Sequence, residues 1–287
     1  MKSIAGVVII YHPDEQELLR NIRSWLSYVG LLIVLDNTEG DNSAIAKSIE
    51  SLGPTVRYIR NEANLGIAAP LNKAFKLALG NGYEWILSMD QDSSFEPDQA
   101  QQYFALFNEH FATTTNIGIV APMHDKPPAI DNLPLYFKKD SVITSGCLNR
   151  LECWEKAGHF DERLVIDEVD HDFCYRVIKA GYQVVQFNDI VLSHQLGTKV
   201  TGGYMGVIAK KNRIIHSPRR LYFIVRNYLY VRKKYRQDFG PEFKKRDGMI
   251  MTEIKNNLLF SAKFFASLRA VWRGYRDYKS GNFNKTL

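Results

Sequence analysis

Short apolar runs alternate with amphipathic stretches along residues 4–111. The runs IAGVVIIY, LLIVLDN, TVRYIRN and EWILSMD are rich in apolar and β-branched residues, as buried strands are. In the stretches between them, apolar residues recur every three or four positions, as Leu18, Ile22 and Leu26 do, which indicates amphipathic helices. The pattern predicts strands at 4–11, 31–37, 55–61 and 84–90, alternating with helices at 14–29, 42–52, 68–82 and 96–111.

This alternation is typical of an α/β fold whose central sheet is mostly parallel and built from βαβ units. In such sheets, ligands bind beyond the carboxyl ends of the strands. Polar residues close each of the four strands, so we expect these residues to line one rim of the sheet. They are Tyr11 and His12, Asp36 and Asn37, Asn61 with Asn64 and Gly66, and Asp90 with Gln91 and Asp92.

The second half of the chain has a less regular pattern. Residues 122–134 form a Pro-rich loop, and the acid-rich stretch 165–183 contains a predicted helix. Residues 183–197 are strand-like and end near His194. We find no internal repeat and no low-complexity tract in this sequence.

Composition narrows the class of protein. The 287 residues are 45% hydrophobic and 12% aromatic, which is enough for a sizeable core and is not typical of disorder. The three cysteines form no CxxC pair, which favours a reducing, cytosolic compartment without disulfides or a zinc site. No run reaches the roughly 18 apolar residues of a membrane span. The N-terminal run leads into His12 and Pro13 rather than a signal-peptide cleavage site, so we interpret it as a strand.

The net charge of +6 is unevenly distributed along the chain. Residues 1–216 hold 20 Lys and Arg against 26 Asp and Glu, whereas residues 217–287 hold 17 against 5. Such a basic segment attracts phosphates, whether in lipid headgroups, nucleic acid or a charged substrate. Nucleic-acid binding would explain this charge but not the acidic rim of the predicted sheet.

Residues 252–278 combine this basic charge with a helical pattern of apolar residues. Two interpretations stay open: a helical appendage packs on the main domain with these residues in its core, or a helix lies on an anionic membrane surface. The apolar residues are Ile254, Leu258, Phe265, Leu268 and Trp272.

Asp90 and Asp92 stand one residue apart at the end of the fourth predicted strand. Two carboxylates so close repel each other, and residues i and i+2 of a strand point to the same side. Both can therefore reach one hard cation, Mg²⁺ or Mn²⁺, which prefers oxygen ligands and often keeps phosphate oxygens as partners. The alternative is a solvated turn that caps the helix near residue 97.

A second cluster of carboxylates lies in the stretch IDEVDHDFCYR. On a helix, Asp172 and Arg176 stand one turn apart and can pair. This leaves Asp170 to face a cleft, where it can act as a general base. The alternative is a solvated acidic helix start, which the helix dipole favours. His194 is either a structural histidine or, together with the Asp90–Asp92 pair, an imidazole ligand of the metal.

These motifs, taken in order, resemble the inverting family 2 glycosyltransferases, which have a GT-A fold. The resemblance spans residues 4–235, and the segment VWRGYRDYKSG shows a weaker similarity. The DQD form, the stretch FDERLVIDEVDHDFCYR and the downstream SPRRLYFIVRN look most like the bacterial rhamnosyltransferase subgroup. The segments that carry the family resemblance are VVIIYHPDEQELLRNI, VLDN, NEANLGIAAPLNKAF, ILSMDQDSSFEPD, TSG, AGHFDERLVIDEVDHDFCYR and SHQLG.

The resemblance implies a domain organisation. Residues 1–216 are expected to form the GT-A catalytic domain, with its nucleotide-binding part in residues 1–122 and its acceptor-side part in residues 123–216. Residues 217–287 are then a basic, amphipathic helical extension.

The resemblance also implies a role for each matching residue. Asp36 matches the acid that hydrogen-bonds the nucleotide base, and Asp90 and Asp92 match the pair that holds Mn²⁺ or Mg²⁺. His194 matches a third metal position, and Asp170 matches the catalytic base. Tyr11, His12, Asn64, Gly66 and Gln91 join Asp36 and Asp90 in binding the nucleotide sugar, and Ser145, Gly146 and Asp167 lie on the acceptor side.

One departure from the family pattern concerns the base. Many relatives carry a Glu-Asp pair at this position, whereas here Val169 precedes Asp170. Asp167 and Glu168 are therefore competing candidates for the base.

The expected activity is the transfer of a sugar, with inversion, from a nucleotide sugar. The resemblance favours L-rhamnose from dTDP-L-rhamnose, moved to a glycan or lipid-linked acceptor at the cytoplasmic face of a bacterial membrane. One alternative is another sugar, such as N-acetylglucosamine, galactose or galactofuranose from a UDP-sugar. The other is a non-catalytic module that binds a nucleotide sugar or a membrane. Contact with an anionic membrane surface and a homo-oligomer both stay open, and a nucleic-acid partner is not expected.

Overall fold

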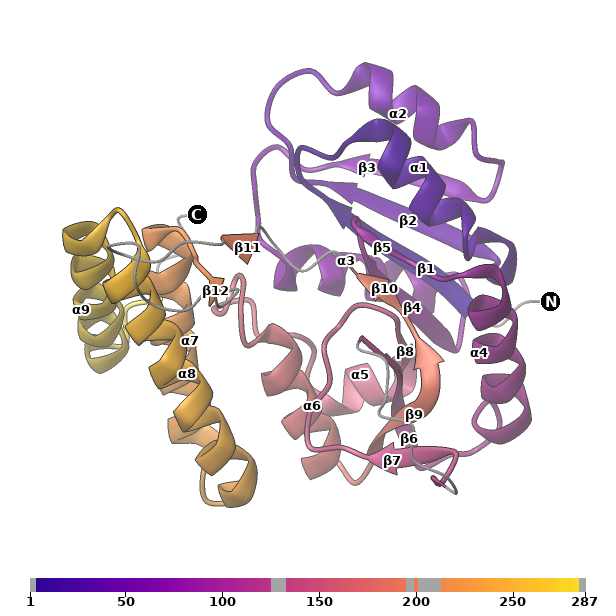
Figure 1. Ribbon diagram of the computed structural model, residues 1–287. Coiled ribbons are helices and arrows are strands. Elements are labelled where there is room, and N and C mark those ends of the chain that lie inside the picture. The colour runs from indigo at the N-terminus through magenta and orange to yellow at the C-terminus, as the bar shows by residue number, and fades with distance from the viewer. Residues whose placement is uncertain (1–3, 125–132, 195–198, 201–212, 284–287) are drawn as a thin grey trace. The chain divides into compact units, whose positions relative to one another are not determined.

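The computed structural model describes residues 4–124, 133–194, 199–200 and 213–283. Most of the predicted Pro-rich loop at 122–134 and the end of the stretch 183–197 lie outside these ranges. The chain divides into two compact units (Figure 1). Unit 1 comprises Met1–Val165 and Val169–Gln195, and unit 2 comprises Ile166–Glu168 and Leu196–Leu287.

Unit 1 is built on one mixed, mostly parallel sheet of eight strands. The strands are β1 (Ile4–Ile10), β2 (Leu31–Asp36), β3 (Val56–Arg60), β4 (Trp85–Asp90), β6 (Ile117–Met123), β7 (Tyr136–Lys138), β8 (Cys147–Arg150) and β9 (Gln183–Val191). Their order is β3-β2-β1-β4-β8-β6-β9-β7. The first four form parallel pairs, which confirms the predicted α/β class, while β8 and β7 run antiparallel to their neighbours.

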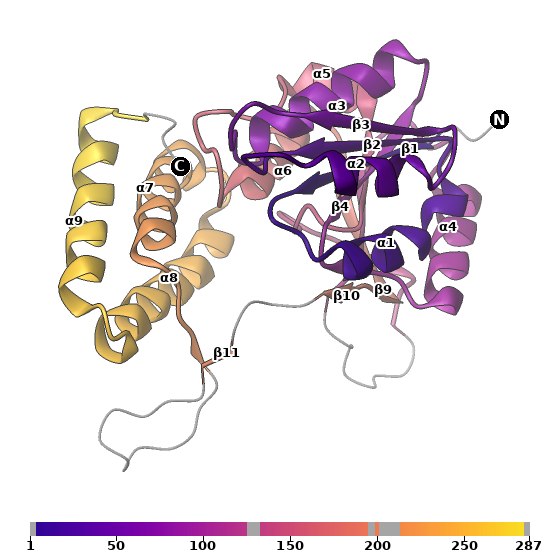
Figure 2. The same cartoon turned by 90° about the horizontal axis from the view of Figure 1, so that it is seen from above.

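Helices cover both faces of this sheet (Figure 2). Apolar residues of α1 (Glu15–Arg23) and α4 (Pro97–His110) share one buried cluster with β1, β2 and β4. On the other face, α3 (Ala68–Gly80) packs against β1, β2 and α5 (Leu151–Ala157). Two more helices, α2 (Ser43–Glu50) and α6 (Val169–Lys179), contact β3 and β9, respectively.

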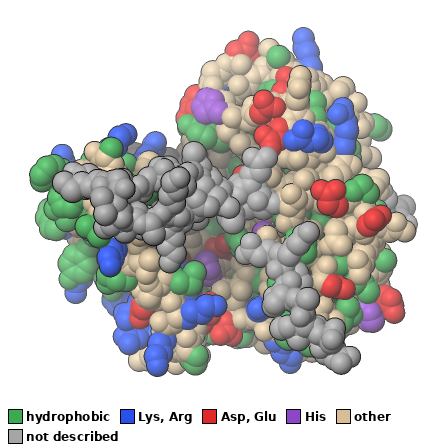
Figure 3. All heavy atoms as spheres, viewed as in Figure 1, with side chains coloured by type: hydrophobic (Ala, Val, Ile, Leu, Met, Phe, Trp, Pro, Cys, Tyr) green, Lys and Arg blue, Asp and Glu red, His purple; other side chains and the backbone are tan. Residues whose placement is uncertain are grey.

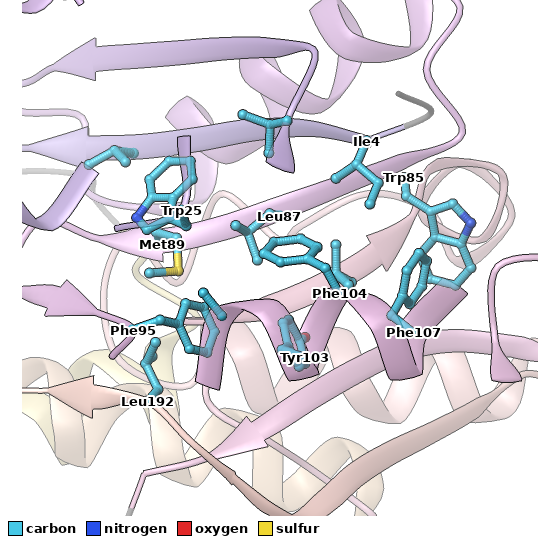
Figure 4. Close-up of a cluster of buried hydrophobic side chains, with 14 of the residues drawn as sticks. Ile4, Trp25, Trp85, Leu87, Met89, Phe95, Tyr103, Phe104, Phe107 and Leu192 are labelled. Atoms are coloured by element: carbon cyan, nitrogen blue, oxygen red, sulfur yellow. The ribbon is translucent and has the colours of Figure 1, made fainter. Parts of the chain in front are cut away.

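Aromatic side chains from α4 pack against β4 (Figure 4). The rings of Trp85 and Phe107 meet edge to face with 4.9 Å between centroids. The Tyr103 hydroxyl donates to the carbonyl oxygens of Val120, at 2.9 Å, and Gly146, at 2.7 Å. The same buried helix therefore holds both the strand that ends at Asp90 and the turn before β8.

The predicted helix at 14–29 is shorter in the structure. It ends at Arg23, and a 3-10 turn, η1 (Leu26–Tyr28), follows. The break lets Trp25 enter the core beside Gly6, where a Cβ atom would lie 2.8 Å from the Trp25 ring. The apolar spacing continues through the break because these residues still face the core, so the spacing alone does not reveal the break.

The predicted acid-rich helix in the stretch 165–183 also begins later than the cluster of acids. Helix α6 starts at Val169, whereas Val165, Asp167 and Glu168 have φ angles of 62°, 58° and 67°. Such left-handed conformations are uncommon for residues other than glycine and strained for a β-branched one. Asp167 and Glu168 are therefore not part of the helix that carries Asp170.

Unit 2 consists mainly of three helices, α7 (Pro218–Tyr235), α8 (Gly240–Phe260) and α9 (Phe264–Ser280), with a short pair of strands, β11 (Lys199–Val200) and β12 (Arg213–Ile214). The predicted helical stretch 252–278 is thus divided between α8 and α9. None of the helices in the described ranges is long and apolar enough to cross a membrane.

Candidate active site

The ends of β1 and β4 are joined by side-chain amides. Gln91 Oε1 accepts a hydrogen bond from Tyr11 N at 2.8 Å, and Gln91 Nε2 donates to Tyr11 O at 3.3 Å. Asn21 Nδ2 on α1 donates to Gln91 O at 3.0 Å. Gln91 therefore fixes the spacing of the two strand ends, and the polar residues at these ends lie on one rim as predicted.

Asp36 is fully buried at the end of β2 and organises the loop that follows it. Its Oδ1 accepts from Thr38 N at 2.7 Å, and its Oδ2 accepts from Asn42 Nδ2 at 2.9 Å and from the Tyr58 hydroxyl at 2.5 Å. Burial, and then the bond to Asp36, raise the pKa of Tyr58. A carboxylate offers about four acceptor positions, and three of those of Asp36 are occupied within the loop.

The loop after β2 also supports the end of β1. Thr38 Oγ1 accepts from His12 N at 2.9 Å, and His12 has a φ of 44°. Its imidazole Nε2 lies 3.4 Å from Glu39 Oε2 in an exposed position. The backbone of Tyr11 and His12 is thus held from both neighbouring strands.

A network of asparagines shapes the loop after β3. Asn37 Nδ2 donates to Gly66 O at 2.8 Å, Asn61 Nδ2 donates to Asn37 Oδ1 at 3.0 Å, and Gly66 N donates to Asn64 Oδ1 at 2.9 Å. The structure thus brings Asn64 and Gly66 to the rim through Asn37, whose structural role the sequence did not reveal.

Gly66 also sits directly against the segment that precedes the acidic cluster. Its φ is 72°, and a Cβ atom there would lie 2.4 Å from Val165 O. Ile67 N donates to the same carbonyl oxygen at 2.7 Å. This close approach of two backbones requires glycine.

Ser145 holds the backbone of Asp90 in position. Asp90 N donates to Ser145 Oγ at 3.1 Å, and that hydroxyl donates to Ser93 Oγ at 2.8 Å. Ser145 is itself buried, and Gly146, with a φ of 82°, closes the turn against Pro122. The TSG turn therefore supports the DQDS segment, while contact of Ser145 with an acceptor stays a prediction.

Asp90 and Asp92 are half-buried at the rim. The backbone of His194, in β10 (Ser193–His194), pairs with Ser93 in β5 (Ser93–Ser94), one residue after Asp92. The side chain of His194 lies outside the described part of the structure. Within the described part, no three His, Cys, Asp or Glu side chains cluster as a metal site. The two carboxylates offer the oxygen donors that Mg²⁺ and Mn²⁺ prefer, and the metal assignment stays a prediction.

Asp170 lies in the first turn of α6 with a largely buried side chain. Its Oδ1 accepts from His171 N at 2.9 Å and lies 3.1 Å from His171 Nδ1. The predicted pair of Asp172 and Arg176 is confirmed, with 2.8 Å between Oδ2 and Nε. Arg176 also donates to the carbonyl oxygens of residues 157 and 158, so Asp172 has a structural role.

Asp167 and Glu168 belong to unit 2, where each meets an arginine. Arg220 donates to Asp167 Oδ1 at 3.2 Å, and Arg246 forms a buried ion pair with Glu168. Burial raises the pKa of Asp167 to about 6, although Arg220 opposes this shift, and Asp167 Oδ2 has no hydrogen-bond partner among the described residues. Asn227 further holds this segment by donating to the carbonyl oxygens of residues 166 and 167.

The buried thiol of Cys147 is influenced by both Asp90 and Asp170. Burial raises the pKa of Cys147 well above its ordinary value, and the charges of Cys174, Asp170 and Asp90 add to the rise. The influence of a charge falls with distance, so the end of β4 and the start of α6 each lie within electrostatic range of Cys147 in unit 1.

Asn72 is a further residue whose role the sequence did not suggest. From α3, its Oδ1 accepts from Phe160 N at 2.8 Å and from Trp154 Nε1 at 3.1 Å, and its Nδ2 donates to Phe160 O at 3.0 Å. These bonds fix the turn between α5 and the acidic segment. A polar residue on an otherwise apolar helix face was the only signal for this role in the sequence.

Comparison with known proteins adds sequence relatives. Residues 6–147 match the model of the family described as glycosyl transferase family 2. The chain is 27% identical over 253 residues to "dTDP-rhamnosyl transferase RfbF" of Shigella flexneri, with 81% of each chain covered. It is 23% identical over 223 residues to "Uncharacterized glycosyltransferase MJ1057" of Methanocaldococcus jannaschii, with 72% of this chain and 75% of the relative covered.

Solved structures share the fold at low identity. A crystal structure of GalNAc-T7 with UDP, GalNAc and Mn²⁺ matches 67% of this chain with a TM-score of 0.55 and 10% identity. The structure of S. aureus TarS matches 92% with a TM-score of 0.53 and 14% identity. The matches cover 43% and 44% of those longer chains. From the family match and the shared fold of these structures, we conclude that residues 6–147 form a glycosyl transferase family 2 domain within a GT-A fold.

Proposed function

We propose that this glycosyltransferase moves L-rhamnose from dTDP-L-rhamnose to a growing bacterial cell-surface glycan or a lipid-linked acceptor. The observation that carries the choice of sugar is the similarity, over 81% of both chains, to a protein named as a dTDP-rhamnosyl transferase. The position of Asp90 and Asp170 in the same unit, where both act on the buried Cys147, supports a transfer site in unit 1.

Asp170 is the proposed base of an inverting displacement. Its carboxylate takes the proton of the acceptor hydroxyl as that oxygen bonds to the anomeric carbon, and the bond from this carbon to the donor phosphate breaks. The match of the stretch IDEVDHDFCYR to the family pattern supports this choice. In the same stretch, Asp167 pairs with Arg220, Glu168 with Arg246 and Asp172 with Arg176.

The donor site is proposed at the rim of the sheet. Asp36 accepts from the nucleotide base, and the backbone of Tyr11 and His12 with the loop of Asn64 and Gly66 holds the nucleoside. Asp90 with Gln91 lies beside the sugar phosphate, and Ser145, Gly146 and Asp167 lie toward the acceptor. The hydrogen bonds that join these strand ends support a preorganised site.

Asp90 and Asp92, with His194, are the proposed holders of Mn²⁺ or Mg²⁺. The oxygen donors at the end of β4 support a hard cation. When bound, such an ion neutralises charge on the leaving diphosphate. The fold is shared with a protein whose crystal structure contains Mn²⁺.

We place the reaction at the cytoplasmic face of the bacterial membrane, with unit 2 on the anionic surface. The net charge of +12 in residues 217–287 and the three buried cysteines support this placement.

A panel of nucleotide sugars tests the donor assignment. The purified enzyme is incubated with dTDP-L-rhamnose, UDP-N-acetylglucosamine, UDP-galactose and UDP-galactofuranose, each with Mn²⁺, with Mg²⁺ and with EDTA. We expect release of dTDP from dTDP-L-rhamnose above all others, and loss of the activity in EDTA. Turnover of a UDP-sugar without turnover of dTDP-L-rhamnose would end the rhamnose assignment. No turnover of any donor, with nucleotide binding intact, would favour a non-catalytic module.

A further inference from the structure

Helix α9 exposes its large apolar residues and packs its small ones against α7. The face toward α7 carries the small or polar residues Ser267, Ala270, Gly274 and Asp277, all buried. At Gly274 a Cβ atom would lie 2.8 Å from Tyr222 O, so the two helices approach closely. The packing of α9 on α7 therefore uses the small face and leaves the apolar one exposed.

The exposed face of α9 carries a stripe of large apolar side chains. We define the apolar stripe as Phe264, Phe265, Leu268, Trp272 and Tyr275. Phe265 is 82% exposed and Trp272 is 59% exposed. The interpretation of these positions as a packed core is therefore wrong for Phe265, Leu268 and Trp272. An exposed apolar patch of this kind marks an interaction surface.

A basic row, Arg269, Arg273 and Arg276, runs along α9 beside the apolar stripe. In Figure 3, Lys and Arg side chains in blue and hydrophobic ones in green gather over the part of the chain that α7, α8 and α9 form. A helix with an apolar stripe next to a cationic row has the pattern that binds in the interface of an anionic bilayer.

A pocket of about 400 Å³ opens between the start of α7 and α9. Arg219, Arg269 and Arg273 line it, together with the aromatic side chains of Tyr222 and Phe223. Its walls therefore combine three guanidinium groups with apolar surface, which suits an anion attached to a hydrocarbon chain.

The pocket is lined by more positively than negatively charged side chains. Its one acid, Asp277, already accepts from Tyr222, at 2.9 Å, and from Arg276, at 2.8 Å. Arg219 and Arg269 form no ion pair with any residue in the described ranges. Two guanidinium groups in the pocket thus keep their charge for a ligand, and guanidinium binds phosphate oxygens well because its planar donors fit them.

We propose that the α7–α9 pocket binds the phosphate of an anionic membrane lipid while the apolar stripe of α9 enters the headgroup region of the bilayer. This proposal deepens, and rests on, the proposed placement of the transferase at a membrane. The side-by-side arrangement of stripe, basic row and pocket favours a lipid surface over a protein or nucleic-acid partner, since one amphiphile satisfies all three features.

Trp272 provides the measurement. The other three tryptophans, Trp25, Trp85 and Trp154, are buried. We expect the fluorescence of the intact enzyme to shift to the blue, and the enzyme to float, with phosphatidylcholine vesicles that contain about one third phosphatidylglycerol, an anionic lipid, and not with pure phosphatidylcholine vesicles. Absence of binding to the anionic vesicles would overturn the proposal.

Two double variants distinguish binding of lipid in the pocket from a general effect of positive charge on the surface. Arg219→Gln with Arg269→Gln is expected to weaken vesicle binding roughly thirtyfold, from about 1 kcal/mol for each charge near the surface. The matched control is Lys244→Gln with Lys255→Gln, which removes the same charge from exposed positions on α8. Equal losses in both variants would contradict the pocket assignment. Circular dichroism confirms that both variants are folded.

Two further arms identify the source of the phosphate and isolate the proposed reaction. Inorganic phosphate and glycerol 3-phosphate are added at millimolar concentration to the intact enzyme on vesicles. Release from vesicles by either would assign the pocket to a soluble phosphate and contradict the lipid proposal. Release of dTDP from dTDP-L-rhamnose in detergent-free solution is expected to be the same in the pocket variant and the intact enzyme. If the intact enzyme itself releases no dTDP, the proposed function is contradicted, whereas the result of the vesicle experiment still stands.

Discussion

The carboxylates of Asp167 and Asp170 lie three residues apart in the sequence, yet they have different surroundings. Asp170 is in the first turn of α6 in unit 1, beside His171 and close enough to Cys147 to raise the pKa of that thiol. Asp167 is in unit 2, bonded to Arg220. A general base must reach its substrate, and our proposal gives that role to Asp170, which lies in the same unit as Asp90.

We expect Asp170→Asn to lower kcat for sugar transfer by about 10² to 10⁴-fold, the usual contribution of a general base. Nucleotide affinity should stay unchanged, because the amide keeps the size of the carboxylate. Steady-state kinetics and calorimetric titration with dTDP measure the two quantities. Asp167→Asn is the comparison. If it loses transfer while Asp170→Asn keeps it, the assignment of the base is wrong.

Asp167 makes stability depend on pH. Burial raises its pKa from 3.8 to about 6 in the folded protein, so the folded state holds this proton more tightly than the unfolded state. Both states are protonated below pH 3.8, and the cost of the buried charge then grows as pH rises to about 6. At 1.4 kcal/mol for each pKa unit, the full cost is about 3 kcal/mol.

We therefore expect Asp167→Asn to be more stable, relative to the natural chain, at pH 7.5 than at pH 4.5. The variant lacks the titration, and the weakened contact with Arg220 adds only a constant offset. Urea denaturation followed by circular dichroism at both pH values measures the difference. A difference between the two proteins that is the same at both pH values would show that Asp167 does not titrate in this range.

At the level of elements, the loop after β3 depends on the close approach of Gly66 to Val165. Gly66→Ala adds a methyl group 2.4 Å from Val165 O in a backbone with positive φ. We expect a loss of about 1–2 kcal/mol from the conformation and a further 1–3 kcal/mol from the overlap. Since Asn64 and Asn37 share this loop, the KM for the donor should also rise. Denaturation and donor kinetics measure these effects.

Gly82→Ala is the matched control for this substitution. Its φ of 79° is close to that of Gly66, but no atom of the described residues lies within 4 Å of the added methyl group. We expect only the conformational loss and no change in KM. Equal losses in the two variants would mean that the contact with Val165 contributes nothing.

The strands and most helices of unit 1 could be predicted because their burial imposes a simple period on the sequence. The rim of the sheet followed from the residues that close β1, β2, β3 and β4. The left-handed backbone at Asp167 and Glu168 could not be predicted, because those residues are held by Asn227 and Arg246, which lie far away in the sequence. The outward direction of the apolar stripe was equally hidden, since a helical period does not say which face packs.

For the whole molecule, charge and chemistry are divided between the two units. Unit 1 holds Asp36 and Asp90 at the rim of the sheet and Asp170 at the start of α6, whereas the positive charge is concentrated in residues 217–287. Only the residues 166–168 interrupt this division, because the chain enters unit 2 for that segment and then returns to Asp170. A donor and a membrane lipid should therefore affect separate parts of the chain.

Hydrogen exchange of the intact chain tests this separation. We expect dTDP with Mn²⁺ to slow exchange in peptides that contain residues 10–12, 36–42, 61–67 and 90–93, because a ligand raises the free energy of opening only where it binds. Exchange in α9 should not change. Anionic vesicles should slow exchange only in α7 and α9 and should leave the peptides of the rim unchanged. Protection of α9 by the nucleotide, with none at the rim, would place the donor in unit 2 and contradict the proposed site, whereas vesicle protection of the rim alone would contradict the lipid site.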